Sequence, residues 1–439
     1  MTTQPDPAAL LRSITLACPA CGATRPGTST RFRCACGTPL DIAPVGFPLE
    51  PLSTDDLRTT FAQRLSAVTG SARSGVWRYR ELVLPLPEQS IVSRAEGATP
   101  LHNVGAAQVS GGWRRIGEYA GLDWLTLKHE GENPTGSFKD RGMTVGMSVA
   151  RSLGVRAVAC ASTGNTSASL AAYAAQAGLP ALVFLPAGKV ASGKLAQSIA
   201  YGARRVEVAG DFDEAMRQVE AVADDLGIYL LNSINPYRLA GQRSIGYELL
   251  QQLDWQAPDW IALPAGNLGN TSAIGAALIH ARQLGLISRT PRIAAIQAAG
   301  AAPFYQSYAA RWRELVPVRA QTRATAINIG APVSYVRARA VIEATRGVVA
   351  QVSDEEIFAA KAQIDRAGIG CEPASAASLA GVRRLRAEGV IAPDARVLAI
   401  LTGHLLKDTA QATTEDEEAD ADVETLTRQV RAALQRLSA

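Results

Sequence analysis

The sequence has no strong excess of either charge and no long apolar run. Its 44 Lys and Arg residues against 40 Asp and Glu residues leave a formal net charge of +4 over 439 residues. This small charge gives no basis for nucleic acid or an anionic membrane as the main partner. No apolar run reaches the roughly 18 residues that cross a bilayer, and the polar, proline-containing start is unlike a signal peptide. We therefore expect a soluble cytoplasmic protein.

Two common nucleotide-binding motifs are incomplete. Gly131 to Gly136 has the spacing that opens a phosphate-binding loop, but Ser137-Phe138-Lys139 follows where Gly-Lys-Ser/Thr should close it. Gly266 to Gly269 does not supply the G-x-G-x-x-G pattern of a dinucleotide-binding fold. The sequence therefore predicts neither a P-loop protein nor a dinucleotide-binding protein.

The chain is long enough for two or more domains, since 439 residues with 47% hydrophobic content can bury large cores. From Val155 onward, short apolar segments alternate with helical segments, which is typical of an α/β fold with a parallel sheet covered on both faces. Sites in such sheets lie beyond the carboxyl ends of the strands, so we expect chemistry in the loops that follow them. The predicted strands are residues 125–130, 157–160, 181–185, 205–208, 228–231, 260–263 and 397–401, and the predicted helices are residues 168–176, 193–201, 213–225 and 273–280.

Six cysteines occur, and four of them lie within the first forty residues. Cys18 and Cys21 form one pair and Cys34 and Cys36 a second, with a glycine after each pair that allows a tight turn. This spacing predicts a zinc-ribbon-like knuckle with a structural zinc, although the second pair has one residue between its cysteines where two are usual. A metal-free or disulfide-forming hairpin is the alternative. Four thiolates would leave no open position for a catalytic metal.

A turn and a helix meet at Lys139. Pro134 and Gly136 favour a turn, and the apolar and small residues after Lys139 suit a buried helix. A lysine that is desolvated at a helix N-terminus loses part of its preference for the charged form and becomes a usable amine nucleophile. The stretch taken alone fits a solvated surface lysine beside Asp140 equally well.

Two later loops have the composition of anion sites. Ser162 to Ser167 follows the strand at 157–160, and its hydroxyl and N–H groups suit the α-carboxylate of an amino acid or, alternatively, only cap a helix. Pro264 to Thr271 follows the strand at 260–263, and its glycines allow successive N–H groups to point inward, ahead of the next helix. This second loop predicts a phosphate cradle, with a plain strand-to-helix turn as the alternative.

A second phosphate group would be well served by three further side chains. Arg238 offers a planar fork of donors, Lys194 a point charge and Ser233 a neutral donor. Basic residues on loops are more often simply solvated. The three residues alone therefore fit either a phosphate site or a solvated surface.

The run from Asn133 to Gly142 resembles the active-site signature of threonine synthases, within the fold-type-II enzymes that use pyridoxal phosphate. The resemblance extends from about Thr99 to Asp408. It implies two parallel-sheet domains of the tryptophan synthase β-like (fold type II) kind, together with the N-terminal knuckle. The expected division is residues 1–45 for the knuckle, 46–135 for an arm and the first part of a large cofactor domain, 136–245 for a small domain, 246–409 for the rest of the large domain, and 410–439 for an acidic linker and a C-terminal helix.

The same resemblance implies roles for these loops. Lys139 would hold the cofactor and move protons, Asn165 would bind the phenolic oxygen of the cofactor, and Thr402 would bind its pyridine nitrogen. The cofactor phosphate would lie on the loop of Gly266, Asn267, Leu268, Gly269 and Asn270. The substrate-binding residues that it implies are Ser162, Thr163 and Thr166 for the carboxylate, and Lys194, Ser233 and Arg238 for a phosphate group.

The implied activity converts O-phospho-L-homoserine and water into L-threonine and phosphate, in a homodimer. One alternative is a related dehydratase or β-replacement enzyme that uses the same cofactor on serine, threonine or phosphoserine. An alternative of another class is a zinc-ribbon binding protein with an inactive enzyme body. The sequence departs from the family at Asn328, Ala331 and Leu405, where arginine, asparagine and glycine are more usual.

Overall fold

The computed structural model describes residues 6–43, 52–162, 164–186, 192–208, 219–220, 223, 226–409, 428 and 431. The chain divides into two compact units, Met1–Lys407 and Asp408–Ala439. The helix predicted at 213–225 and the acidic linker and helix predicted at 410–439 fall largely outside the described residues.

The larger sheet has six strands in the order β12-β11-β10-β13-β5-β4. Neighbouring strands pair in parallel, except that the edge strand β4 runs antiparallel to β5. The predicted parallel sheet is confirmed, and an antiparallel edge strand is a common addition to such sheets. The bounds are β4 Leu101–Asn103, β5 Leu125–His129, β10 Trp260–Pro264, β11 Arg292–Ala298, β12 Val348–Val352 and β13 Val397–Leu401.

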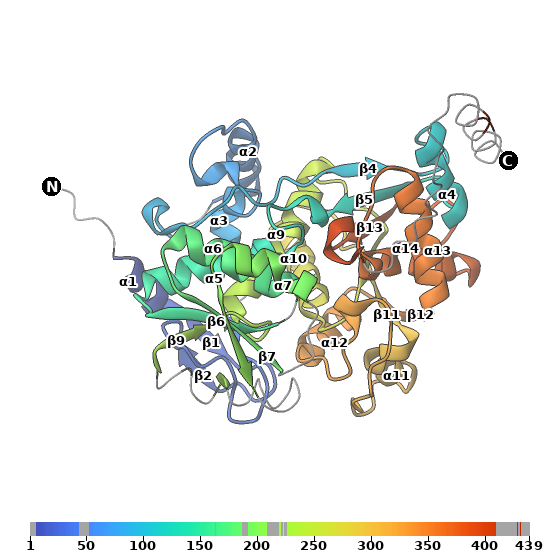
Figure 1. Cartoon of the computed structure of the whole chain (residues 1–439). Helices are drawn as coiled ribbons and strands as arrows, with labels where there is room; N and C mark the ends of the chain where they lie inside the picture. The colour runs from blue at the N-terminus through green and yellow to red at the C-terminus, as the bar shows by residue number, and fades with distance from the viewer. Residues whose placement is uncertain are drawn as a thin grey trace. The chain divides into compact units, whose positions relative to one another are not determined.

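The smaller sheet has four parallel strands in the order β8-β7-β6-β9. Figure 1 shows β6, β7 and β9 apart from β5, β11 and β13, so the two sheets form separate groups of strands. All four strands of this sheet were predicted from the sequence to within a residue at either end. Their bounds are β6 Ala157–Ala161, β7 Ala181–Pro186, β8 Arg204–Val208 and β9 Ile228–Leu230.

Helices cover both sheets. In the larger sheet, α14 packs on β10, β11 and β13, while α10 packs on α9 and α12. In the smaller sheet, α6 packs on β6 and β7 and also contacts α5 and α7. The helices are α1 Pro7–Ser13, α2 Thr54–Leu65, α3 Arg80–Val83, α4 Arg114–Ala120, α5 Lys139–Ser152, α6 Asn165–Ala177, α7 Ser192–Ala200, α9 Pro236–Gln252, α10 Gly269–Gln283, α11 Pro303–Ala309, α12 Tyr335–Ala344, α13 Asp354–Arg366 and α14 Pro373–Ala387.

Helices α5 and α9 cross at a contact that only glycine allows. A Cβ atom on Gly241 would lie 2.0 Å from the carbonyl oxygen of Arg141, and one on Gly142 would lie 2.7 Å from the carbonyl oxygen of Arg238. These distances are far below ordinary van der Waals contact. The backbone of α9 is therefore held against the first turns of α5, the helix that begins at Lys139.

The N-terminal segment forms a three-stranded antiparallel sheet in the order β2-β1-β3, with bounds β1 Thr15–Ala17, β2 Thr24–Pro26 and β3 Asp41–Ala43. The segment that follows, which we expected to be an arm, contains α2, whose first turn is closed by a capping box at Ser53. Trp77 and Tyr79 of this arm are fully buried, and the Trp77 indole donates to Thr144 Oγ1 at 2.8 Å. The arm is thus packed against α5.

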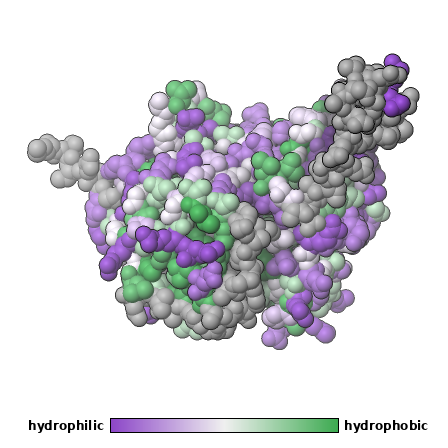
Figure 2. Space-filling view, in the orientation of Figure 1, coloured by the Kyte–Doolittle hydropathy of each residue, from purple (hydrophilic) through white to green (hydrophobic). Residues whose placement is uncertain are grey.

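The visible face in Figure 2 carries mostly hydrophilic residues, with smaller groups of hydrophobic residues between them. Within the described ranges, none of the helices is both long and apolar enough to span a membrane.

Candidate active site

The loops that follow the strands of the larger sheet meet at its carboxyl edge. The segment before Lys139 pairs with the segment after β13, through a bridge between Ser137 and Gly403. The Phe138 amide donates to the Thr402 carbonyl at 3.0 Å, and the His404 amide donates to the Gly136 carbonyl at 2.9 Å. Two segments far apart in sequence are therefore joined at the end of parallel strands, where sites in such sheets form.

Lys139 is the first residue of α5, at the border between loop and helix that the sequence predicts. Burial lowers the pKa of Lys139 to about 7, and the positive charge of Arg238 lowers it further, against the opposite effect of the Glu372 carboxylate. Its amine also lies 4.3 Å from the centre of the Phe138 ring. An amine with this pKa is half neutral near pH 7, as a nucleophile and proton acceptor must be.

Asp140 holds the loop that precedes Lys139 in place. Its buried carboxylate accepts hydrogen bonds from the Thr135 amide at 2.7 Å, the Thr135 hydroxyl at 2.6 Å and the Ser169 hydroxyl at 2.5 Å. Burial raises the pKa of Asp140 to about 6, although these hydrogen bonds favour the ionised form. Since Ser169 belongs to α6, Asp140 ties the lysine loop to the helix that begins at Asn165.

Glu372 joins two of the predicted cofactor-binding residues. Its carboxylate accepts from the Asn165 side-chain amide at 2.9 Å and from the Thr402 hydroxyl at 3.3 Å. Thr402 is also 3.0 Å from the Ser375 hydroxyl, which in turn accepts from the Thr402 and Gly403 amides. Burial raises the pKa of Glu372, with the Asn165 hydrogen bond acting the other way. The structure thus brings Asn165 and Thr402 to one buried carboxylate, which also acts on Lys139 electrostatically.

The glycine-containing loop after β10 leads into α10 with polar groups left unpaired. Leu268 has a positive φ of 63°, which turns the chain into the first turn of α10 at Gly269. Asn270 and Thr271 follow, and both polar atoms of the buried Asn270 side chain and the Thr271 hydroxyl lack a hydrogen-bond partner among the described residues. Buried polar groups without partners are costly. Their position at a helix N-terminus suits a phosphate group, which accepts hydrogen bonds.

One of the predicted substrate-phosphate residues, Ser233, contacts this loop. Ser233 Oγ accepts a hydrogen bond from the Asn267 side-chain amide at 2.7 Å. Arg238 is buried and donates through Nη1 to the Leu231 carbonyl at 2.8 Å, while its Nε and Nη2 have no partner within the described part of the chain. Burial lowers the pKa of Arg238 to about 10. A buried guanidinium with two unpaired nitrogens is suited to bind an anion.

Three predicted carboxylate-binding residues follow β6, and only two of them are described. Ser162 and Thr166 are half-buried on either side of the start of α6, and Thr163 lies outside the described residues. Lys194 belongs to α7, but its side chain is also outside the described part. Asn328, one of the departures from the family, is exposed, whereas the neighbouring Ile327 packs within 3.1 Å of where a Cβ of Gly266 would stand.

A buried ionic cluster at the start of α5 was not predicted from the sequence. Arg141 pairs with Glu130 at 2.6 Å and with Glu248 at 2.7 Å, and Lys128 pairs with Glu248 at 2.5 Å. All four side chains are fully buried, and Thr99 donates to Glu130 at 2.7 Å. The position of Arg141 two residues after Lys139 was the available signal, but isolated charged residues in a sequence usually indicate a solvated surface. The cluster joins β5, α5 and α9.

Comparisons with known proteins agree with this geometry. The profile of the family described as "Pyridoxal-phosphate dependent enzyme" matches residues 92–403. A threonine synthase from Methanocaldococcus jannaschii is 43% identical over 403 residues, covering 91% of this chain and 95% of the relative. A threonine synthase from Methanosarcina acetivorans is 48% identical over 335 residues, covering 76% of this chain and 80% of the relative.

The chain belongs to the threonine synthases of the pyridoxal-phosphate-dependent enzyme family. Solved structures that it resembles show the same fold at lower identity. Maize serine racemase matches with a TM-score of 0.59 and 22% identity, covering 78% of this chain and 94% of that one. Threonine deaminase isoform 2 from Solanum lycopersicum matches with a TM-score of 0.59 and 18% identity, covering 87% of this chain and 95% of that one.

This threonine synthase family member brings its four N-terminal cysteines together. The Sγ atoms of Cys18, Cys21, Cys34 and Cys36 all lie within 4.8 Å of one another. The Cys18 and Cys36 sulfurs are 3.5 Å apart, and so are those of Cys21 and Cys34. A zinc ion with Zn–S bonds of about 2.3 Å at the centre of a tetrahedron separates its sulfurs by about 3.8 Å. The cluster is therefore compatible with zinc, and the short spacing between Cys34 and Cys36 does not prevent its assembly.

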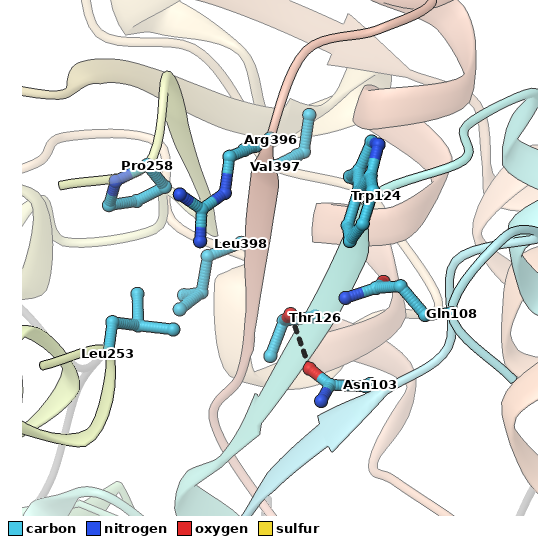
Figure 3. A pocket seen from close by; sticks show the side chains of 9 residues that line it. All are labelled: Asn103, Gln108, Trp124, Thr126, Leu253, Pro258, Arg396, Val397 and Leu398. Carbon is cyan, nitrogen blue, oxygen red and sulfur yellow. Dashed lines mark hydrogen bonds between the residues drawn. The ribbon is translucent and has the colours of Figure 1, made fainter. Parts of the chain in front are cut away.

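A pocket of about 170 Å³, whose lining residues are drawn in Figure 3, lies at the amino ends of β5 and β13 in the larger sheet. It is lined by the first residues of β13 and β5, including Val397 and Thr126, and the Thr126 hydroxyl donates to Asn103 at 3.0 Å. None of the residues predicted to bind cofactor or substrate lines it. Because Lys139, Thr402 and Gly266 follow the carboxyl ends of the strands, this pocket is separate from the candidate active site.

Proposed function

We propose that this chain converts O-phospho-L-homoserine and water into L-threonine and phosphate. The observation that carries the proposal is the buried Arg238, whose Nε and Nη2 have no partner among the described residues and whose charge acts, with that of Glu372, on the partly buried Lys139. A catalytic amine together with a guanidinium that has two unpaired nitrogens suits a phosphorylated amino acid. The reaction breaks the bond between Cγ and the bridging oxygen, which leaves with the phosphate. Cβ loses one hydrogen and gains the hydroxyl of water, and Cγ gains one proton, so the atoms balance.

Pyridoxal phosphate supplies an electron sink that stabilises negative charge at the substrate Cα when it is bound. In our proposal, Lys139 holds the cofactor through its amine, Asn165 and Thr402 bind its ring, and the loop from Gly266 to Asn270 binds its phosphate. The unpaired polar atoms of Asn270 and Thr271 fit that group, because a phosphate would accept the hydrogen bonds that they lack.

Lys139 would remove a proton from the substrate Cα and then move protons at Cβ. Its lowered pKa supports this role, because an amine that is half neutral near pH 7 can both accept and return a proton. Glu372 would favour the protonated amine once the proton has moved, since its carboxylate acts on Lys139 electrostatically. The substrate carboxylate would lie on the Ser162 to Thr166 loop at the start of α6.

Arg238, Ser233 and Lys194 would hold the leaving phosphate of the substrate. Support for this role comes from the unpaired Nε and Nη2 of the buried Arg238. Ser233 lies 2.7 Å from Asn267 of the cofactor loop, so substrate phosphate and cofactor phosphate would bind side by side. Two adjacent phosphate sites distinguish this proposal from a dehydratase or β-replacement enzyme acting on serine or threonine.

The direct test incubates the cofactor-loaded protein with O-phospho-L-homoserine and measures phosphate and threonine together. The proposal predicts equal release of both, and loss of both in the Lys139→Ala variant. Phosphate without threonine would indicate an elimination that stops at a keto acid. No turnover by a protein that binds the cofactor would overturn the proposed substrate, and serine, threonine and phosphoserine would be tested next.

We further propose that the four-cysteine cluster binds one structural zinc ion, that the protein is a homodimer, and that it acts in the cytoplasm. The convergence of the four sulfurs supports the zinc proposal. Metal analysis of protein purified without added zinc should give one zinc ion per chain. Sedimentation analysis tests the dimer, and a monomer with full activity would contradict it.

A further inference from the structure

The knuckle is joined to the first turn of α9. The Tyr237 hydroxyl is buried and donates to the Gly27 carbonyl at 2.6 Å. The Phe32 ring stacks edge-on against Tyr229 of β9, with ring centres 5.3 Å apart. The knuckle is therefore attached to the smaller sheet and to α9 through buried groups.

A second contact leaves positive charge without a partner. Asp41 of β3 lies between two buried arginines, 3.4 Å from Arg243 Nη2 and 3.3 Å from Arg337 Nε. Arg337 also donates to the Leu40 carbonyl. Arg243 Nε and Nη1 and Arg337 Nη1 have no partner in the part of the chain that the structure describes. One partly exposed carboxylate thus faces two buried guanidinium groups, and buried charges that are not balanced are costly.

The cysteine cluster and the arginine contact belong to the same small sheet. Cys18 directly follows Ala17, which pairs with Asp41 of β3. Bonds from one metal ion to all four cysteines would hold the turns of this sheet together. Metal binding would therefore stabilise the knuckle and keep Asp41 against the two arginines.

The same turn of α9 carries a proposed substrate-binding residue. Tyr237 and Arg238 are adjacent, and the Asn235 side chain accepts from both of their amides at the start of the helix. Neighbouring residues on a helix point about 100° apart. Tyr237 accordingly contacts the knuckle, while the Arg238 side chain packs against α5 at Gly146 and binds the Leu231 carbonyl.

We propose that a metal ion at the four cysteines fixes the knuckle against α9 and thereby positions Arg238 for the phosphate group of the substrate. The inference rests on the proposed function and on the proposed zinc. Tyr237 is a positioning residue in this account, because it acts through Arg238. Metal loss is expected to weaken binding of the phosphorylated substrate, while pyridoxal phosphate, which is held by other residues, stays bound.

The first test replaces Tyr237 with Phe in the cofactor-loaded protein and leaves the cysteines intact. Loss of one buried hydrogen bond predicts a KM for O-phospho-L-homoserine that is roughly fivefold higher, with kcat, zinc content and cofactor absorbance unchanged. Tyr119→Phe is the matched control, since the Tyr119 hydroxyl has no hydrogen-bond partner among the described residues. An unchanged KM for Tyr237→Phe would overturn the inference.

The second test compares Cys36→Ser with the unaltered protein, both loaded with cofactor. Zinc content should fall, KM should rise at least as much as in Tyr237→Phe, and inorganic phosphate should inhibit more weakly. Reduced zinc with unchanged KM and unchanged phosphate inhibition would overturn the inference and leave the proposed function intact. If the unaltered protein itself forms no threonine, the proposed function fails instead. If Cys36→Ser does not fold, the Tyr237→Phe result decides.

Discussion

Lys139 lies in an environment that strongly disfavours a charged lysine. Its native pKa of about 7 lies well below the ordinary value of 10.5. Between these values the unfolded chain binds a proton that the native chain does not, so the free energy of unfolding should increase with pH there. In cofactor-free protein, Lys139→Met should flatten this increase between about pH 7 and 10, as measured by urea unfolding at several pH values. Identical pH slopes for the two proteins would show that the amine is not desolvated.

For Arg238 the predicted effect is on substrate binding, because its proposed partner is the substrate. Arg238→Ala should raise the KM for O-phospho-L-homoserine by about 10- to 100-fold, the range for a lost hydrogen bond to a charged group. The absorbance of bound cofactor should not change. The exposed Arg282 gives a control, since Arg282→Ala leaves the loop after β10 untouched. A similar KM in both variants would remove Arg238 from the substrate site.

At the scale of elements, the buried ionic cluster holds β5, α5 and α9 together. Glu248 faces both Lys128 and Arg141, so Glu248→Gln would leave two buried cations with only Glu130. Breaking a buried pair in this way costs about 3–5 kcal/mol. Urea unfolding should show that loss.

The matched control for that experiment is Glu118→Gln. Glu118 pairs with Arg114 at 2.8 Å on the surface of α4, with both side chains more than half exposed. Such surface pairs contribute about 0–1 kcal/mol. A Glu248→Gln variant as stable as Glu118→Gln would show that the cluster does not hold these elements together.

Helices and strands could be predicted where a local sequence pattern marks them. The strands of the smaller sheet are short apolar runs, and the border between turn and helix at Lys139 follows from Pro134, Gly136 and the residues after it. The capping box at Ser53 was a local signal for α2 that we did not use in expecting an arm. The antiparallel direction of β4 depends on its pairing with β5, which no local pattern records.

In the molecule as a whole, contacts between segments that are far apart in the chain could not be predicted from the sequence. The carboxylate of Glu372 is 207 residues from Asn165 in the chain, yet it accepts that amide at 2.9 Å. Family resemblance assigned Asn165 to the cofactor but did not indicate this contact. The joining of the knuckle to α9 through Tyr237 and Gly27 was equally hidden, because a tyrosine near a proline turn usually indicates only core packing. Spacing alone did predict that the four cysteines form one cluster.

In the proposed reaction, phosphate leaves by cleavage of the bond between carbon and oxygen, and water then adds at the neighbouring carbon. This order of bond changes can be followed by turnover of O-phospho-L-homoserine in ¹⁸O-labelled water and mass spectrometry of both products. We expect one labelled oxygen in the threonine hydroxyl and none in the released phosphate. Labelled phosphate together with unlabelled homoserine would show hydrolysis at phosphorus and would contradict the proposed reaction.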